Sequence, residues 1–584
     1  MGKLYTADFE TSTKEWYVCD GRARVWAYAI CEIGNPSNFI YGNNIDDFMT
    51  WCMDKKHNYK IWFHNLKFDG EYIFNYLLNN GYECIKDKKD KKDKSFTCLL
   101  SDTGQFYSIE VYFETNEKHT NKVVFYDSLK VLNFSVDKIA KDFNLPIRKL
   151  ELDYKKYRKP GHVLTPDEVD YIRNDVEIMA RALDIMFKKD LKKMTIGSDA
   201  LANYKETVSN FDMYYPVLDY ETDDIIRKSY KGGWTYLNPL YAEKKVDKGI
   251  VIDKNSMYPS MMYNEYLPFG YPEYFEEKYK DDITHPLYIQ MISCSFKIKP
   301  GKLPSIQLKH SLGFMPNEYV ETTNGEIVTM VLTNIDLELF FTQYDVFDIT
   351  YQGGFKFKRI KGLFNKYIDT WINAKIQAKK DGNGALYTIA KLMLNSLYGK
   401  FGLNPNVRGK YPLLHETGKV SYSFYPREIR DSIYVPVASF ITAYARRDII
   451  TNSQAIRDYT LKKYGKDYYI YSDTDSIHCL YLTDEELSQF MDIDDYRLGA
   501  YKKESEFDKA SFIRQKCYVE ISKEGKVNST IAGLPKAMSE YVNLDNFKRG
   551  FTIKADDDNF EKKKLTYLHV KGGVILVETD FTIN

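Results

Sequence analysis

The segment from Tyr468 to Leu480 reads Y-Y-I-Y-S-D-T-D-S-I-H-C-L, and the fold class of this chain follows from it. Two apolar runs flank a short polar centre, which predicts a β-hairpin whose turn contains Asp473 and Asp475. Two carboxylates in a tight turn between buried strands are costly unless they bind a cation. A hydrated surface turn explains Asp-Thr-Asp equally well when the segment is considered alone. The hairpin therefore indicates a metal site only if another part of the chain supplies a further carboxylate.

A second acidic strand supplies that carboxylate. Residues Lys248 to Pro259 read K-G-I-V-I-D-K-N-S-M-Y-P, which predicts a buried strand ending at Asp253 and a turn into a helix. Asp253 and Asp475 could together hold two Mg²⁺ ions for phosphoryl transfer, because paired hard cations activate an oxygen nucleophile and stabilise a leaving oxygen. In this interpretation Asp473 completes the acidic centre.

A helix with polar groups along one stripe lies between these two motifs in the sequence. Gly384 and Gly399 bracket an apolar stretch in which Lys391, Asn395 and Tyr398 occupy positions i, i+4 and i+7. A lysine, an amide and a phenol in one row suit contacts with triphosphate, base and sugar. The alternative is a lysine that extends its apolar stem over a core helix. The two aspartate motifs favour the nucleotide-binding interpretation.

The first third of the chain contains two separate acidic elements. Asp8 and Glu10 belong to an apolar strand that begins near Leu4, and side chains two residues apart share one face of a strand. A second strand begins at Ile61 and continues into a helix whose first turn contains Asp69. Adjacent buried carboxylates repel each other, so this pattern indicates a bound cation.

A well-defined helix adds a fourth carboxylate. Thr165, Pro166 and Glu168 form the sequence signature of a capping box, with proline at the first helical position. Tyr171 and Asp175 follow at i and i+4, hence on one face. Four carboxylates from three elements suit a second two-metal site, in which Tyr171 would orient the attacking water. Taken singly, each of these acids is better explained as an ordinary surface group, and only their combination indicates a site.

Composition limits the classes of protein that remain. The chain has 584 residues with 82 basic and 82 acidic side chains, so a uniformly basic nucleic-acid coat is excluded. The charge is nevertheless uneven, at +8 in residues 353–400 and −6 in residues 482–508, although solvated faces explain either run alone. The eight cysteines include no Cys-x-x-Cys pair, and charged residues interrupt every apolar run, so we expect neither a zinc site nor a membrane-spanning helix.

These motifs resemble the family B DNA polymerases, specifically their protein-primed, phi29-like phage branch, over essentially the whole chain. The three exonuclease motifs match Asp8 to Glu10, Asn65 to Asp69 and Tyr171 to Asp175, and polymerase motifs A, B and C match Asp253 to Pro259, Lys391 to Gly399 and Tyr471 to Ser476. Further counterparts are Ser128, Leu129 and Lys149 for single-strand binding and excision, Tyr230-Lys-Gly232-Gly233 for the YxGG element, and Lys516-Cys-Tyr518 for the KxY element. Lysine at 231 replaces the more common arginine, which puts only a bidentate phosphate contact in doubt.

The resemblance implies an α/β and α+β multidomain chain, with an RNase H-like 3′–5′ exonuclease domain and a right-hand polymerase carrying two insertions. The implied segments are the exonuclease domain at 1–195, palm at 196–265 and 429–541, a first insertion at 266–364, fingers at 365–400, a second insertion at 401–428 and thumb at 542–584. The first insertion would contact a terminal-protein primer, and the second would close a ring on the template.

The implied activity is DNA-directed DNA synthesis that is protein-primed, processive and strand-displacing, with 3′–5′ proofreading. We expect two Mg²⁺ ions per active site, with Mn²⁺ able to substitute. The expected partners are primer-template and single-stranded DNA, dNTPs and a terminal protein, for a monomer in the host cytoplasm and without a membrane. The expected nucleotide contacts are Tyr258, Lys375, Lys391, Asn395 and Tyr398, with Tyr387 at a place where a close relative has a second lysine. The expected DNA contacts are Asn65, Ser128, Leu129, Lys149, Tyr230, Gly232, Gly233, Ser256, Thr474, Lys516 and Tyr518.

Two other classes of function remain open at this point. A 3′–5′ exonuclease whose remaining domains only bind DNA would need the N-terminal acids and not Asp253, Asp473 and Asp475. A non-catalytic single-strand-binding scaffold would use the 50 tyrosines and the basic stretch, and would need neither acidic set. A dNTP-dependent extension assay separates the first alternative from a polymerase, and strict Mg²⁺-dependent turnover excludes the second.

Overall fold

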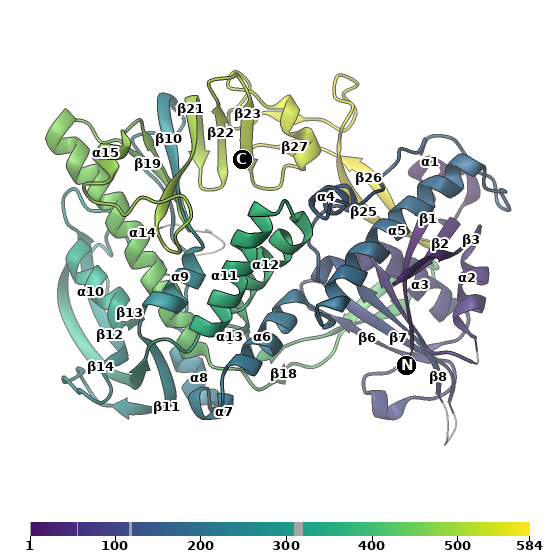
Figure 1. The fold of residues 1–584 in the computed structure, drawn as a ribbon, viewed down its shortest axis with the longest axis horizontal. Coiled ribbons are helices and arrows are strands. Elements are labelled where there is room, and N and C mark those ends of the chain that lie inside the picture. The colour runs from purple at the N-terminus through teal and green to yellow at the C-terminus, as the bar shows by residue number, and fades with distance from the viewer. Residues whose placement is uncertain (1, 55, 116–119, 309–318) are drawn as a thin grey trace.

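The computed structural model describes residues 2–54, 56–115, 120–308 and 319–584. The N-terminal elements lie on the right of Figure 1, and the long helix α14 (Val435–Tyr464) lies on the left. Helices α11 (Asn365–Lys380) and α12 (Gly384–Ser396) lie between these two parts. No helix in the described part of the chain combines the length and apolar character that crossing a bilayer requires.

An eight-stranded sheet forms the N-terminal α/β domain, with strand order β3-β2-β1-β4-β8-β7-β6-β5. Its strands are β1 (Lys3–Thr11), β2 (Val25–Glu32), β3 (Asn35–Gly42), β4 (Tyr59–Phe63), β5 (Glu83–Cys84), β6 (Ser95–Leu100), β7 (Phe106–Thr115) and β8 (Thr120–Asp127). The helices around it are α1 (Lys14–Asp20), α2 (Ile45–Cys52), α3 (Leu66–Asn79), α4 (Val136–Asp142) and α5 (Pro166–Lys188). β1 is central, antiparallel to β2 and parallel to β4.

The alternation of β1 directs its acids toward α5. Phe9 packs against a phenylalanine of α2 on one face of the sheet. On the opposite face, the Thr6 hydroxyl donates a hydrogen bond to the Val176 carbonyl of α5. Because side chains two apart share a face, Asp8 and Glu10 lie on the α5 side with Thr6. The predicted capping box begins α5, with Thr165 and Glu168 reciprocally hydrogen-bonded.

A seven-stranded sheet forms the centre of the second half, with strand order β23-β22-β21-β10-β20-β19-β9. Its strands are β9 (Thr235–Leu237), β10 (Lys245–Lys254), β19 (Tyr469–Asp473), β20 (Ser476–Leu480), β21 (Tyr501–Arg514), β22 (Cys517–Ile521) and β23 (Val527–Ile531). The predicted hairpin is β19–β20, and β10 lies antiparallel to both β20 and β21. The register places Asp253 opposite Ser476, so the end of β10 meets the hairpin turn. Helix α9 (Met257–Asn264) follows β10 as predicted.

The helices beside this sheet carry the polar stripe. Gly384 begins α12, which runs to Ser396, and a short helix α13 (Tyr398–Phe401) follows. The expected helix thus extends to Gly399 in two pieces, with Leu397 retaining helical backbone angles between them. Helix α6 (Ile196–Thr207) and helix α11 pack against α12. Met393, Leu394 and Leu397 are buried, as expected for the packing face.

A four-stranded sheet, with strand order β11-β14-β12-β13, occupies most of the predicted first insertion at 266–364. Its elements are β11 (Leu267–Phe275), β12 (Leu287–Ile298), β13 (Val328–Thr333), α10 (Asn334–Gln343) and β14 (Tyr344–Ile360). Helix α10 packs on this sheet and on α14, which attaches the insertion to the body of the second half.

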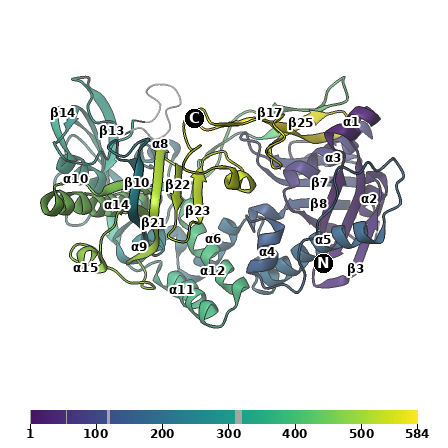
Figure 2. The ribbon, with the colours of Figure 1, turned by 90° about the horizontal axis from the view of Figure 1, so that it is seen from above.

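Two further segments extend from the second half to the N-terminal domain. The first of them, the predicted second insertion, contains β15 (Asn406–Val407), β16 (Lys410–Leu414), β17 (Val420–Phe424) and β18 (Glu428–Ile429). The C-terminal segment contains β24 (Thr552–Ile553), β25 (Lys564–Val570), β26 (Gly573–Thr579) and β27 (Phe581–Thr582). Figure 2 shows β17 and β25 side by side next to α3. Val420, Val570, Val574 and Ile575 are buried in the core of the N-terminal domain.

Two candidate active sites

A cavity of about 420 Å³, here called the central cavity, opens where β10, the hairpin turn and α12 meet. Most of the nucleotide and metal residues predicted from the sequence line it. The lining includes Asp253, Ser256, Tyr258, Lys375, Tyr387, Lys391, Asn395, Tyr398, Asp475, Lys502 and Glu504. The acids come from the sheet and the lysines at 375 and 391 from the helices, so charges of opposite sign face each other across the cavity.

Asp253 and Asp475, two of the three acids that line the central cavity, lie close enough to repel each other. Burial and the neighbouring Asp253 raise the pKa of Asp475 to about 7. Burial raises the pKa of Asp253 as well, although Lys502 opposes that shift from 3.2 Å away. Carboxylates that are costly to ionise side by side become stable when a divalent cation neutralises both. This donor set therefore fits hard-metal binding.

Lys502 and Glu504 lie in the central cavity without having been predicted. Both belong to β21, where Asp253 pairs with Lys502 and the register shifts between Val251 and Ile252. Glu504 is the extra residue of this bulge, and bulges commonly redirect a side chain beside a functional site. The acidic run 482–508 was the only signal in the sequence, and it could not distinguish Glu504 from the other acids.

Asp473 lies outside the lining of the central cavity. Its carboxylate accepts hydrogen bonds from Thr235 and Tyr471, each at 3.2 Å, and pairs with the Lys516 ammonium at 3.1 Å. Thr474 between the two aspartates has φ +63°, in the left-handed region, so the turn sends its two acids in different directions. The structure thus joins Asp473 to Lys516, which we had predicted to contact DNA.

The segment of Tyr230 to Gly233 packs against this turn. The Thr474 amide donates to the Trp234 carbonyl at 2.8 Å. A Cβ at Gly233 would lie 2.7 Å from Thr474 Cγ2 and 3.0 Å from the Tyr258 hydroxyl, closer than side chains tolerate, whereas one at Gly232 would meet nothing within 4 Å. Gly233 is therefore required by close approach.

Two tyrosines form one wall of the central cavity. The Tyr258 and Tyr398 rings lie with centroids 4.1 Å apart and an interplanar angle of 32°. On the cationic side, Lys375 Nζ lies 3.5 Å from Ser256 Oγ. Burial and the nearby Lys391 lower the pKa of Lys375, so an anionic ligand between the two lysines would be favoured.

A second acidic site, here called the N-terminal acidic cluster, forms between β1 and α5. Oxygens of Asp8, Glu10 and Asp175 all lie within 4.8 Å of one another. Burial and Asp175 raise the pKa of Asp8 to about 7, and burial raises those of Glu10 and Asp175. Asp69 lies beside them, its pKa raised by burial and by Asp8. Within the described residues, one oxygen each of Asp69 and Asp175 is buried without a hydrogen-bond partner, as expected of carboxylates that can bind a cation.

Two tyrosines and a lysine surround the N-terminal acidic cluster. Lys149 Nζ lies 2.5 Å from Asp175 Oδ2 and 5.3 Å from the centre of the Tyr171 ring. The Tyr171 hydroxyl lies 2.5 Å from that of Tyr154, a residue that we did not predict. Tyr154 belongs to the irregular segment before α5, and its sequence neighbours carry no motif that indicates a site.

The remaining predicted DNA-contacting residues fall into two groups. Ser128 is fully buried, and its hydroxyl donates to the Phe63 carbonyl at 3.0 Å, which supports the strand before α3. Leu129 is half-buried next to it. Asn65 has φ +78° and donates through its amide group to the Tyr567 hydroxyl at 3.0 Å. In the second half, Tyr230 lines a cavity of about 810 Å³ and Tyr518 packs against Tyr471.

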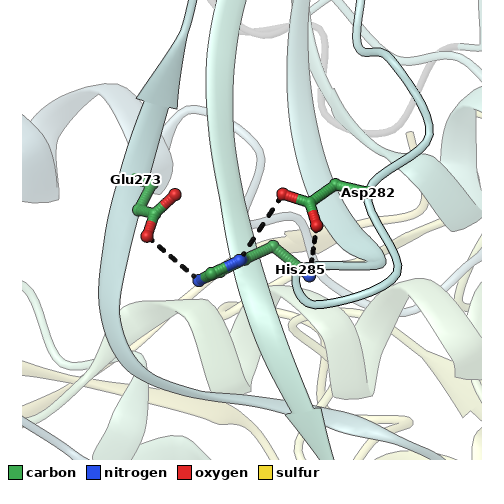
Figure 3. A group of neighbouring side chains, drawn as sticks. All are labelled: Glu273, Asp282 and His285. Carbon is green, nitrogen blue, oxygen red and sulfur yellow. Dashed lines mark hydrogen bonds and ion pairs between the residues drawn. The ribbon is translucent and has the colours of Figure 1, made fainter.

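A third group with metal-ligand chemistry lies in the first insertion, apart from both sites. Glu273, Asp282 and His285 point toward one another in Figure 3. Lys356 Nζ lies 2.6 Å from Asp282 and 3.3 Å from Glu273, so an ammonium of the chain already pairs with both carboxylates. This cluster therefore stabilises the insertion.

Comparison with known proteins identifies the class. A family described as DNA polymerase type B, organellar and viral, matches residues 51–490. The chain therefore belongs to the type B DNA polymerases, and it is a DNA-directed DNA polymerase. Membership in this family implies dependence on divalent metal, in agreement with the donor sets of the two sites.

Comparison with individual proteins shows to which branch of the type B DNA polymerases the chain belongs. The chain is 41% identical to the DNA polymerase of Bacillus phage B103 and 40% identical to that of Bacillus phage phi29, over 100% of this chain and 99% of each relative. The phi29 DNA polymerase structure in an orthorhombic crystal form matches with a TM-score of 0.91 and 38% identity over 100% of both chains. It is thus a phi29-like phage DNA polymerase, which confirms the predicted family and multidomain type B fold.

Proposed function

We propose that the chain replicates DNA by two-metal phosphoryl transfer in the central cavity and proofreads it at the N-terminal acidic cluster. The observation that carries this proposal is the pair Asp253 and Asp475 facing Lys375 and Lys391 across one cavity. When bound, two Mg²⁺ ions, or Mn²⁺ in their place, would lower the pKa of the attacking 3′-hydroxyl and neutralise the leaving pyrophosphate.

The side chains of the chain then bind and orient the nucleotide. Asp253 and Asp475 hold the metal, Lys391 and Lys375 neutralise triphosphate charge, and Asn395 lies one turn beyond Lys391. The Tyr258 ring, braced by Tyr398, lies under the incoming sugar and blocks a 2′-hydroxyl, which selects dNTPs. Asp473 acts through Lys516, whose ammonium it orients toward the primer strand beside Tyr518.

Excision in the 3′–5′ direction is the proposed role of the N-terminal acidic cluster. Asp8, Glu10, Asp69 and Asp175 would hold the metal, and Tyr171 with Lys149 would position water and the scissile phosphate. Asn65, Ser128 and Leu129 would shape the single-strand path, Ser128 through the strand it supports.

The DNA partners follow from the solved relatives. Structures of phi29 DNA polymerase with primer-template DNA and incoming nucleotides, and with single-stranded DNA, match this chain with TM-scores of 0.90. We propose the same ligands here, with Tyr230, Gly232, Gly233, Ser256 and Thr474 contacting primer-template. We also propose the exonuclease, palm, fingers and thumb segments stated above, a terminal-protein primer on the first insertion, and a monomer acting in the host cytoplasm.

Primer extension on circular single-stranded DNA tests this function. With Mg²⁺, dNTPs and no accessory protein, products longer than one circuit support processive, strand-displacing synthesis. Omitting dNTPs should leave only shortening of the primer. Primer shortening without any dNTP-dependent extension would instead support the alternative of a 3′–5′ exonuclease whose other domains only bind DNA.

A further inference from the structure

The second insertion and the C-terminal segment meet on a single helix of the N-terminal domain. β17 and β25 contact each other (Figure 2), and β17 and β26 both contact α3. Each segment extends from the second half of the molecule to α3. The second half, the two segments and the N-terminal domain therefore form a closed ring of contacts. Beside α3, β6 also contacts β16 and α1 also contacts β26, and α3 is the element on which both segments meet.

Glu71 of α3 contacts both segments at once. Its side chain is 3% exposed. Oε1 accepts a hydrogen bond from the Tyr422 hydroxyl of β17 at 2.6 Å, and Oε2 lies 3.4 Å from Nδ1 of His569 in β25. The Tyr422 and His569 rings meet edge to face, with centroids 6.1 Å apart. Among the described residues, Oε2 and His569 Nδ1 form no hydrogen bond, so the ion-pair contact is what links Glu71 to β25.

Neutral side chains near Glu71 also form hydrogen bonds to the two segments. Asn75, one turn further along α3, donates to the Gly418 carbonyl of the second insertion at 3.2 Å. Tyr72 donates to the Val574 carbonyl of β26, and Asn65 donates to Tyr567 of β25 at 3.0 Å. One side of α3 thus binds both segments, and Glu71 supplies a buried carboxylate in the middle of the contact.

Because the carboxylate of Glu71 is buried, losing either of its partners should be costly. Removing a partner from a buried charged group leaves the remaining group without compensation for its lost hydration, which costs far more than a surface pair would. Tyr422 hydrogen-bonds only Oε1, and the imidazole of His569, when protonated, is the charge that compensates Oε2, so Glu71 keeps both contacts only while both segments are docked.

We propose that Glu71 is a latch that holds the second insertion and the C-terminal segment closed on the N-terminal domain, and so keeps the polymerase on its DNA. Glu71 is a positioning residue, since it lies in neither active site. The part of this inference that concerns DNA rests on the proposed function, because the material enclosed by the closed segments is taken to be DNA.

Hydrogen exchange tests the latch without any reaction. The full-length chain is compared with Glu71→Gln, Tyr422→Phe and His569→Gln, and with Glu83→Gln as a control. Glu83 is an exposed acid of the same domain, paired with the exposed Lys92, and it touches neither segment. Exchange in residues 420–424 and 564–570 should become at least tenfold faster in the three latch variants and stay unchanged in Glu83→Gln. Unchanged protection in all three variants would overturn the latch.

Primer extension in the presence of a DNA trap tests the consequence. The latch variants should make products several-fold shorter per binding event, while the rate of single-nucleotide incorporation stays within twofold of the parent. Faster exchange with undiminished product length would overturn the role on DNA and leave the junction in place. If the unsubstituted chain extends no primer, the proposed function is wrong. The hydrogen-exchange experiment then decides on its own whether Glu71 holds the two segments on the N-terminal domain. Tyr422→Phe and His569→Gln retain Glu71, so they decide the outcome even if Glu71→Gln does not fold.

Discussion

The guanidinium of Arg158 lies 2.5 Å from the carboxylate of Glu168, with 2% and 4% of the two side chains exposed. The same carboxylate accepts the Thr165 amide of the capping box and contacts His162 at 2.7 Å. One acid therefore both begins α5 and holds the preceding segment, which brings Tyr154 and Lys149 to the N-terminal acidic cluster.

Glu168→Gln should destabilise the protein by about 3 kcal/mol near pH 7, because it leaves the Arg158 guanidinium buried without a counter-charge. Against the cost of burial, the Thr165 amide, Arg158 and His162 lower the pKa of Glu168 to about 2. A lowered pKa stabilises the fold above the unfolded value near 4.5, and this stabilisation is lost as the pH falls toward 2. Urea unfolding at several pH values measures the difference, with the exposed Glu151→Gln as control. A gap that persists undiminished near pH 2 would contradict the assignment.

The two active sites should be separable by single substitutions. Asp475→Asn should reduce primer extension on the order of a thousandfold and leave 3′–5′ excision intact, because it removes a metal ligand from the central cavity alone. Asp8→Ala should do the reverse. Each variant is assayed for extension with dNTPs and for degradation of a labelled primer without them. Normal extension by Asp475→Asn would disprove the proposed catalytic role.

Metal binding in the central cavity should depend on pH. The pKa of Asp475 is about 7, so below that value the cation must displace a proton, and affinity should weaken by about tenfold per pH unit. Mn²⁺ binding is measured by electron paramagnetic resonance between pH 5.5 and 8.5 in an Asp8→Ala background, which weakens the other site. Asp475→Asn should flatten the dependence. Affinity that does not change with pH in the Asp8→Ala protein would refute the prediction.

Discrimination against ribonucleotides should depend on the ring of Tyr258 rather than on its hydroxyl. Tyr258→Val opens the wall shared with Tyr398 and should lower the ratio of kcat/KM for dCTP over CTP, on the order of a hundredfold. Tyr258→Phe keeps the ring and should keep the ratio. An unchanged ratio in the valine variant would place the sugar elsewhere.

Two adjacent glycines should respond differently to alanine. Gly233→Ala forces a Cβ against Thr474 and Tyr258 and should cost about 2 kcal/mol, with at least tenfold slower extension. Gly232→Ala introduces its Cβ into open space and is the matched control. Thermal unfolding and extension are measured for both, and equal behaviour of the two variants would contradict the close approach at Gly233.

Local sequence patterns were sufficient for the elements that carry the acids. The hairpin at Tyr468 to Leu480, the strand ending at Asp253 and the capping box at Thr165 all appear as predicted. In these segments the period of apolar residues and the turn chemistry agree with the final structure.

Other site residues depend on relationships between distant segments. Lys502 and Glu504 reach the central cavity only through the register and bulge of β21 against β10, some 250 residues apart in the chain. The direction of Asp473 depends on the left-handed conformation of Thr474, a residue type that does not signal it. Arg158 and Tyr154 belong to an irregular segment whose course is set by tertiary pairing with Glu168 and Tyr171.

The shared core at α3 limits the modularity of this enzyme. Val420, Val570, Val574 and Ile575 belong to segments that extend from the second half of the chain, yet they are buried in the core of the N-terminal domain. A truncation that removes residues 1–195 would expose this apolar set and leave two long segments without a docking surface. Chimaeras with a foreign proofreading domain would have to carry α3, the second insertion and the C-terminal strands together as one exchangeable unit.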